Sequence, residues 1–282
     1  MSRVAIITDS ACDLPPERAA AAGITLVPLL VRFGADELRT HEEISIDAFY
    51  ERLLAPGSPL PSTAACAPGE FEAAFARRLD EGADAVVCLT VGSRLSATYA
   101  AARLAAEAMP RRAVHVVDSM SATMGQGLLA LAAAEAAAAG ERADAIVRML
   151  EARRTESRIF VALETLDYLR RGGRISAAQA AIGSVLSVKP VITIADGVVE
   201  TLDKPRTAAR ARARLLELAS ERPIERLAII HSRAPGIDTF RAAMAAVTGV
   251  PQQAMEMQLV GPSIAPHVGP GAFGFAVLAR EA

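Results

Sequence analysis

The sequence lacks the residues that mark disulfide-rich or zinc-binding proteins. It has three cysteines and no tryptophan in 282 residues, and aromatic residues make up only 4% of the chain. Cys12, Cys66 and Cys88 are odd in number, widely spaced and without a CxxC pair. Neither a disulfide framework nor a zinc site is therefore indicated, and no metal site is predicted.

A large net charge and a long apolar run are also missing. The formal net charge is −2 at pH 7, so there is no long-range attraction to nucleic acid or to an anionic membrane. No run reaches the ~20 apolar residues of a membrane-spanning helix, and the chain passes at once into a strand pattern at residues 4–8. We expect a cytoplasmic protein without stable membrane insertion, whose partners are small molecules or proteins.

Regular alternation of strand and helix patterns is what the sequence does have. Repeated strand–loop–helix units predict a mostly parallel sheet flanked by helices. Beyond an arginine-rich helix pattern at 142–154, Asp196-Gly197 predicts a hairpin and hence antiparallel pairing. The predicted fold is α/β with two α/β domains: residues 1–157 with a mostly parallel sheet, and residues 158–282 with a mixed sheet and helices.

Short polar loops follow several of the predicted strands, where ligand sites form in open α/β sheets. They contain Asp9, Ser93 with Ser96, and Ser119. Each is equally suited to capping the helix that follows. A further loop between prolines offers two more hydroxyls, those of Ser62 and Thr63.

Two loops in the second half carry stronger signals. One pairs two glycines with Arg170, Arg171 and Arg174, which suits a phosphate, a carboxylate or an acidic protein surface, although a solvated turn would look the same. In the other, His267 stands alone in a run of glycines and prolines that can form neither a helix nor a regular strand. Such a backbone suits a loop that holds one imidazole against a ligand, although a tight surface connection with a solvated histidine would have the same composition.

Two enzyme classes remain open on these residues. A phosphotransferase would need a nucleotide cradle, yet there is no P-loop, and the dinucleotide-like run at 125–130 falls inside a predicted helix. A serine hydrolase could use Ser93 or Ser119 with His267 and Asp9 or Asp118, but no Gly-x-Ser-x-Gly elbow is present.

The motifs taken together resemble the DegV family in order and spacing over essentially the whole chain. The two specific runs are Leu166-Asp167-Tyr168-Leu169-Arg170-Arg171-Gly172-Gly173-Arg174-Ile175 and His267-Val268-Gly269-Pro270-Gly271-Ala272. Less specific matches include Asp9-Ser10, the 61–71 stretch, the 93–99 stretch, Asp118-Ser119 and 189–191.

The resemblance implies a lipid-binding protein similar to the fatty-acid-binding subunit of bacterial fatty acid kinase. Such a subunit has no cofactor and no expected activity alone; it binds a long-chain fatty acid between its two domains and presents it to a separate ATP-binding kinase subunit. The head-group residues of the family fall on Thr63, Ser93 and His267, with Ser62, Ser96, Asp9, Ser119 and Gly269 as further candidates. Contacts with the kinase or the acyl phosphate are expected from Arg170, Arg174 and Arg206.

The chain departs from the usual DegV pattern in two loops. Where the family commonly reads Thr-Ser-Gln-Pro-Ser, this sequence has Thr63-Ala64-Ala65-Cys66-Ala67, and Gly92 and Ala97 replace a frequent serine and a glycine. These changes leave the three expected head-group residues in position but alter their surroundings.

Overall fold

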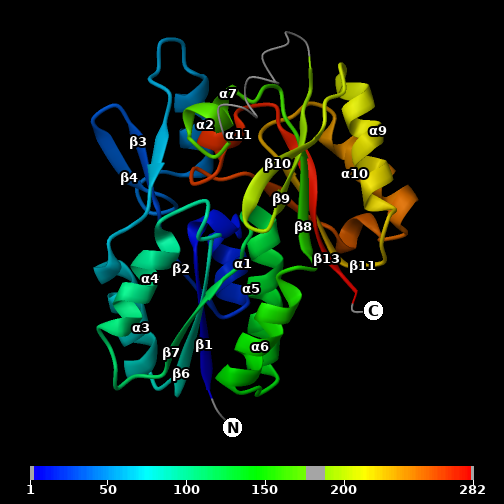
Figure 1. The fold of residues 1–282 in the computed structure, drawn as a ribbon. Helices are drawn as coiled ribbons and strands as arrows, with labels where there is room; N and C mark the ends of the chain where they lie inside the picture. The colour runs from blue at the N-terminus through cyan, green and yellow to red at the C-terminus, as the bar shows by residue number, and fades with distance from the viewer. Residues whose placement is uncertain (1–2, 176–187, 281–282) are drawn as a thin grey trace.

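The first sheet of the structure, a computed structural model that describes residues 3–175 and 188–280, is parallel. Its four strands lie in the order β2-β1-β6-β7 (Figure 1). Alternate residues of β1 and β6 pack on opposite faces, so both faces are buried under helices. The strands are β1 (Val4–Asp9), β2 (Ile24–Val27), β6 (Ala85–Thr90) and β7 (Val114–Asp118).

Helices cover the two faces of this sheet differently. One face carries α3 (Pro68–Asp80) and α4 (Thr98–Glu107), and the other carries α1 (Pro16–Ala21), α5 (Thr123–Ala138) and α6 (Ala143–Arg153) (Figure 1). A 3-10 turn, η1 (Ser10–Cys12), follows β1. The parallel sheet expected for the first half is confirmed.

The second sheet has six strands in the order β10-β9-β8-β13-β11-β12. Only the β11–β12 pair is parallel, so the sheet is mixed, as predicted. Helices α9 (Ala208–Ala219) and α10 (Ile237–Thr248) cover its outer face (Figure 1). The strands are β8 (Ser157–Ala162), β9 (Val191–Ala195), β10 (Val198–Asp203), β11 (Ile224–His231), β12 (Glu256–Leu259) and β13 (Phe273–Ala279).

A third, antiparallel sheet and several short helices complete the part of the chain that the structure describes. The sheet has the order β4-β3-β5 and projects from the first half next to α2 (Figure 1). The remaining elements are β3 (Leu30–Phe33), β4 (Asp36–Arg39), β5 (Ser62–Ala64), α2 (Ile46–Leu54), α7 (Asp167–Arg171), η2 (Gln252–Ala254) and α11 (Ala265–Val268).

The sequence prediction differs from the structure in its shortest elements. The apolar pattern of residues 24–31 predicts a single strand, but β2 ends at Val27 and β3 begins at Leu30, with Pro28 between them. Proline has no N–H to donate to a sheet ladder, so the chain leaves one sheet there and enters another. Strands β4 and β12, each of four residues of which at least two are polar, were not predicted.

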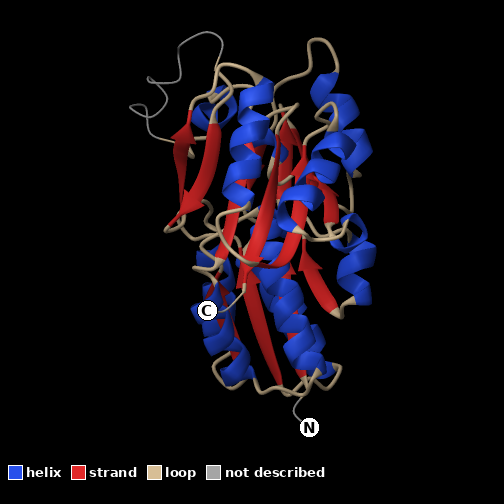
Figure 2. Ribbon diagram, turned by 90° about the vertical axis from the view of Figure 1, so that its right-hand side faces the viewer, coloured by secondary structure: helices blue, strands red, loops and turns tan. Residues whose placement is uncertain are grey.

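Helix α5 joins the two large sheets. Residues 123–134 are all buried, and the helix contacts β1 of the first sheet as well as β8, β11 and β13 of the second. Figure 2 shows the long strands and helices of the two halves stacked end to end. Gly125 allows close packing, because a β-carbon there would collide with Ser121 Oγ and the Ile159 side chain. The dinucleotide-like glycine run therefore belongs to a buried helix.

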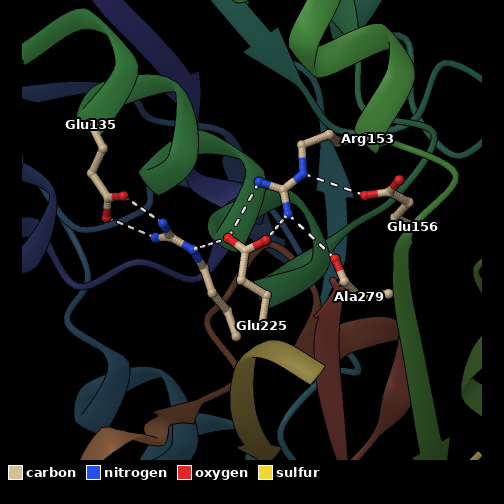
Figure 3. Close-up of polar contacts among 6 residues, drawn as sticks. Glu135, Arg153, Glu156, Glu225 and Ala279 are labelled. Carbon is tan, nitrogen blue, oxygen red and sulfur yellow. Dashed lines mark hydrogen bonds and ion pairs between the residues drawn. The ribbon is translucent and has the colours of Figure 1, made fainter. Parts of the chain in front are cut away.

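An ion-pair network ties the two halves together on the side of α6 (Figure 3). Arg153, only 8% exposed, binds Glu225 of β11 through both terminal nitrogens and lies 3.4 Å from Glu156. Glu225 also accepts from Arg226, which in turn binds Glu135 of α5. The predicted domain boundary near residue 157 falls at the first strand of the second sheet, next to this network; the division into two domains stays a prediction.

No helix within residues 3–175 and 188–280 is long and apolar enough to cross a membrane. Within the same residues, no group of three or more histidine, cysteine or acidic side chains is placed to hold a metal ion.

Candidate functional site

A cavity of about 300 Å³ lies where the loops of the first sheet meet the inner face of the second. The two halves contribute to it in different ways. The first half supplies mainly loop residues that follow its strands, such as Ala11, Val91, Leu95 and Ala122. The second half supplies the faces of its strands together with residues of α7, α11 and the loops beside them, such as Leu169, Val260 and His267. The cavity is thus built from residues of both halves.

Alternation along the strands of the second sheet explains its apolar wall. Ile159 and Val161 of β8 line the cavity, while Phe160 between them packs against the opposite core under α9. In β9, Ile192 and Ile194 face the cavity in the same way. Successive side chains of a strand point to opposite faces, so one face can be wall and the other core. The β-branched wall contains no polar side-chain atom and suits an aliphatic ligand.

Thr63 and His267 meet at this cavity although they are 204 residues apart. Thr63 Oγ1 lies 2.8 Å from Nε2 of His267, and both residues line the cavity. Thr63 comes from β5, whose register places it opposite Val31 of β3. His267 lies in α11, which packs against α7. The expectation that this glycine- and proline-rich run forms no helix is therefore wrong for residues 265–268, where proline stands in the first turn and glycine follows the last residue. A β-carbon at Gly172 would collide with the imidazole, so only glycine leaves space for the ring there.

The imidazole of His267 is neutral at pH 7. Burial, and to a smaller extent the positive charge of Arg174, lower its pKa from 6.5 to about 4. Nδ1 faces Gly172 and has no hydrogen-bond partner among the described residues. An unpaired acceptor costs less than an unpaired donor, so we assign the proton to Nε2, from which it donates to Thr63 Oγ1. The Thr63 hydroxyl proton is then free to point to a ligand.

Arg174 places a permanent positive charge on the cavity wall beside His267. Its Nε donates to the carbonyl of Leu95 at 3.0 Å and its Nη1 donates to the carbonyl of Gly172. Burial lowers the pKa of this guanidinium, although it stays protonated at neutral pH. No ion pair with a carboxylate is found for Arg174 in the described residues. Its charge is therefore open to an anionic head group.

Comparison with known proteins identifies a family that matches nearly the whole chain. The model of the DegV family, a family of uncharacterised proteins, matches residues 3–280. A DegV domain-containing protein of Streptomyces coelicolor is 40% identical over 291 residues, which cover 99% of this chain and 100% of the relative. This chain belongs to the DegV family.

Solved DegV structures agree with the fold. A fatty-acid-binding DegV protein from Thermus thermophilus superposes with a TM-score of 0.89 at 32% identity, covering 99% of this chain and 100% of that one. DegV from Bacillus subtilis, described as a fatty acid binding protein, superposes with a TM-score of 0.86 at 30% identity over 99% and 100% of the two chains.

The structure does not bring all three expected DegV head-group residues together. Thr63 and His267 meet, but Ser93 is exposed, does not line the cavity, and is held at its backbone by Asp118 Oδ1 at 3.1 Å. Ser96 lines the cavity instead and shares a 2.8 Å hydrogen bond with Thr98. Ser62, which alternates with Thr63 along β5, is exposed.

The other DegV lipid-site candidates lie behind the cavity and organise its loops. Asp9 is fully buried, accepts from the N–H groups of Ala11 and Val91, and has a pKa that burial raises to about 6. Ser119 closes a turn by bonding to the backbone of Ser121. Gly269, at φ 71°, lies against the ring of Tyr168, which a β-carbon would strike. None of Asp9, Ser119 and Gly269 lines the cavity.

The two arginines expected to meet a partner besides Arg174 are on the surface. Arg170 is exposed on α7 and forms an ion pair with Asp167 at 3.0 Å. Arg206 is exposed on the loop before α9. Because α7 packs against α11, Arg170 stands on the outside of the element that supports His267.

The hydrolase arrangement does not form in the described residues. His267 Nε2 is bonded to a threonine, its Nδ1 has no carboxylate partner, and Ser119 is occupied in its own turn. A triad needs a base bonded to the nucleophile and oriented by a third group.

Sequence reasoning missed several residues of the cavity. Thr123, His231 and Ser263 line it, although the position of His231 directly after a strand pattern in the sequence indicates only packing or a strand-end hydrogen bond. Three positions at which the chain departs from the DegV pattern, Ala64, Ala65 and Ala97, line it as well. Loop composition signals that a site is near but not which side chain turns inward.

Proposed function

We propose that this protein is a fatty-acid carrier that buries one long acyl chain and holds its carboxylate at Thr63 and His267. The observation that carries the proposal is the cavity itself, whose wall of isoleucine and valine ends at a hydroxyl–imidazole pair beside an arginine. Solved members of the family that resemble this chain are described as binding fatty acids, which supports the same ligand class.

The energetics suit such a ligand. Each buried methylene contributes about 0.8 kcal/mol, so some fifteen of them give roughly 12 kcal/mol before ordering costs. A carboxylate at the other end must keep its hydrogen bonds, since losing them costs about 1–3 kcal/mol or more. The Thr63 hydroxyl can donate to the carboxylate, and Arg174 adds a charge in a partly buried position where its attraction is weakly screened.

We propose further that the carboxylate is presented to a separate ATP-binding kinase subunit. A carboxylate oxygen would attack the γ-phosphorus of ATP, the bond to the bridging oxygen would break, and acyl phosphate and ADP would form. Exposed Arg170 on α7, directly outside the head-group end, suits contact with the kinase, and Arg206 is a second exposed candidate. No P-loop is present in the chain for a nucleotide of its own.

Mass spectrometry of lipid extracted under denaturing conditions from purified protein tests the carrier. We expect about one fatty acid per chain. Absence of fatty acid, together with ester hydrolysis that is lost in Ser93→Ala, would favour the hydrolase instead, and ATP turnover by the protein alone would favour a phosphotransferase.

A reconstituted assay with an ATP-binding fatty acid kinase subunit tests the partnership. His267→Ala should impair acyl-phosphate formation, and normal phosphorylation by this variant would remove His267 from the proposal. Arg170→Ala should weaken coupling to the kinase while leaving lipid retention intact. Equal loss of both functions would contradict a role for Arg170 in contacting the kinase.

A further inference from the structure

The Thr63–His267 pair joins elements from opposite halves of the molecule. Thr63 lies in β5 of the small antiparallel sheet, which belongs to the first half, and His267 lies in α11 of the second half. The Thr63 hydroxyl and His267 Nε2 are nevertheless 2.8 Å apart. Such a bond is lost by about 3.6 Å, so a shift of either element by about 1 Å would break it. Side chains that connect the two elements therefore control the geometry of the head-group end.

Ser10, the first residue of η1, is a side chain that bonds to both sides. Its Oγ lies 2.7 Å from Oγ1 of Thr40 and 2.9 Å from Oγ of Ser263, and it accepts the N–H of Leu29 at 2.9 Å. A hydroxyl has one proton and two acceptor positions, so these three bonds saturate it. Ser10, Thr40 and Ser263 are all buried, so a bond lost among them is not replaced by one to bulk water.

On one side, Ser10 holds the sheet that carries Thr63. Thr40 donates to the carbonyl of Leu29 through its N–H, at 2.9 Å, and through its hydroxyl, at 3.1 Å. Leu29 comes directly before β3 and Thr40 directly after β4, so this pair extends the ladder between the two strands. Val31, two residues after Leu29, lies opposite Thr63. The bonds of Ser10 therefore fix the part of the sheet next to Thr63.

On the other side, Ser10 holds the segment that leads to His267. Ser263 lies in the turn directly before α11, and the N–H of His267 bonds to the carbonyl of Ile264 at 2.9 Å. Ser263, Ile264 and His267 all line the cavity. Because these residues belong to one hydrogen-bonded turn, a shift of Ser263 would carry the imidazole with it.

Two further side chains of the first half hold the same segment. The Tyr50 hydroxyl donates to the carbonyl of Val260 at 2.9 Å, and Asp13 Oδ1 accepts the N–H of Gly261 at 2.9 Å. A β-carbon at Gly261 would lie only 3.0 Å from Asp13 Oδ1, so glycine permits this close approach. The segment 260–263 is thus positioned by the first half, and Ser10 alone among these three side chains also bonds directly to Leu29 and Thr40 beside the small sheet.

We propose that Ser10 is a positioning residue for the head-group end and keeps Thr63 and His267 within hydrogen-bond distance. The inference rests on the proposed fatty-acid carrier function. Ser10 does not line the cavity, so it acts on the ligand only through the residues that it holds. Binding groups must be kept within about 0.5 Å of their working geometry by the hydrogen bonds behind them. Ser10 supplies such bonds to both sides of the pair from a single oxygen atom.

A double-mutant cycle separates positioning from a general loss of stability. Protein freed of lipid is titrated with palmitic acid by calorimetry, with Ser10→Ala and Thr63→Val made singly and together. Ser10→Ala alone should weaken binding about fivefold, but by less than about twofold when Thr63→Val is already present, because the hydroxyl to be positioned is then gone. A merely structural loss would add in full to the effect of Thr63→Val.

A second variant and a matched control complete the test. Thr40→Val keeps the shape of the side chain but removes the hydroxyl that bonds to Ser10, so it should show the same loss and the same dependence on Thr63, even where Ser10→Ala fails to fold. Ser157→Ala removes a buried hydroxyl that also joins two elements, through a 2.8 Å bond to the carbonyl of Gly125, but that does not line the cavity. It should bind palmitic acid normally, and urea unfolding of each variant compares their stabilities.

The inference is wrong if the folded variants Ser10→Ala and Thr40→Val bind palmitic acid as tightly as the unaltered protein. It is equally wrong if their loss of affinity stays the same in the Thr63→Val background. Both results leave the carrier function standing. Failure of the unaltered protein to bind palmitic acid is a different outcome, which overturns the carrier function and this inference with it.

Discussion

The two large sheets of this protein are built from similar residues but contribute to the site in different ways. The parallel sheet is covered by helices on both faces, and β6 is buried along its whole length. The mixed sheet is covered by helices on its outer face, while strands β8, β9 and β10 leave part of the inner face to a cavity. The first sheet therefore contributes its loop ends to the site, and the second contributes a strand face.

This difference bears on both the polarity and the shape of the site. Buried Asp13 and Thr123 follow strands of the first sheet, whereas the apolar wall belongs to Ile192 and its neighbours in the second. Polar side chains of the second half, among them His231 and His267, line the cavity as well. Substitutions in the first set should change the response to pH. Substitutions in the second should change how much aliphatic chain fits.

The largest effect is expected from pH acting on the first sheet's loops. Burial raises the pKa of Asp13 from 3.8 to about 7, so between these values the folded protein holds a proton that the unfolded chain has lost. Stability therefore falls as pH rises from about 4 to 7, by on the order of 4 kcal/mol in total. Asp13→Asn should remove this part of the dependence in chemical unfolding measured at pH 5 and pH 8. Parallel profiles for the two proteins would show that Asp13 does not titrate in this range.

The next largest effect should come from filling the cavity space beside the second sheet. Val161→Trp places an indole in the cavity, and each displaced methylene of the ligand forfeits about 0.8 kcal/mol, so affinity for palmitic acid should fall on the order of a hundredfold. Val198→Trp, on a strand of the same sheet but away from the cavity, is the control and should bind normally. Calorimetric titration with palmitic acid measures both, and equal affinities would place the ligand elsewhere.

The junction between the two halves should respond to loss of Arg153. Arg153→Met leaves Glu225 with only Arg226 as partner and should lower the free energy of unfolding by about 2 kcal/mol, less than for a fully buried pair because Glu225 is partly exposed. The exposed pair of Arg142 with Asp144 offers a control, since Arg142→Met should leave the free energy of unfolding nearly unchanged. Urea unfolding of both variants makes the comparison. Equal effects would mean that the network of Figure 3 does not couple the halves.

The smallest effect should come from single hydroxyls at the head-group end. Thr63→Val removes one donor to the carboxylate and should weaken palmitic acid binding about tenfold. Ser96→Ala and Ser93→Ala compare two expectations. The family pattern places Ser93 at the head group, whereas in the structure only Ser96 of the two lines the cavity. Titration of all three variants with palmitic acid should show a loss of affinity for Ser96→Ala and none for Ser93→Ala. The reverse order would restore Ser93 to the head-group set.

Much of this architecture follows from the sequence. Asp196 and Gly197 both adopt positive φ, at 47° and 75°, as a two-residue hairpin turn requires, so antiparallel pairing of β9 and β10 was predictable from two residues. Ser45 caps α2 through the N–H of Ala48, and a serine directly before an apolar helix pattern is a sequence signal for such a cap. The turn and the helix cap each depend on residues that are adjacent in the sequence, so the sequence alone predicts them.

The parts that escaped prediction depend on contacts distant in sequence. Ser93 and Ser96 lie three residues apart in one loop, and only packing against the second sheet decides which of them turns inward. Arg174 was expected at a partner surface because arginine loops are usually exposed, yet its aliphatic stem and guanidinium lie along the cavity wall. The burial of Thr123 on the cavity wall depends on its neighbours in space and has no sequence signature.

A crystal structure of the protein with palmitic acid brominated at the chain terminus tests the central claim most directly. The account predicts a carboxylate oxygen within about 3.2 Å of Thr63 Oγ1, and anomalous density for bromine within the cavity beside the wall of β8 and β9. A carboxylate at Thr123 and His231 with the bromine near His267, or a ligand outside the cavity, would contradict it.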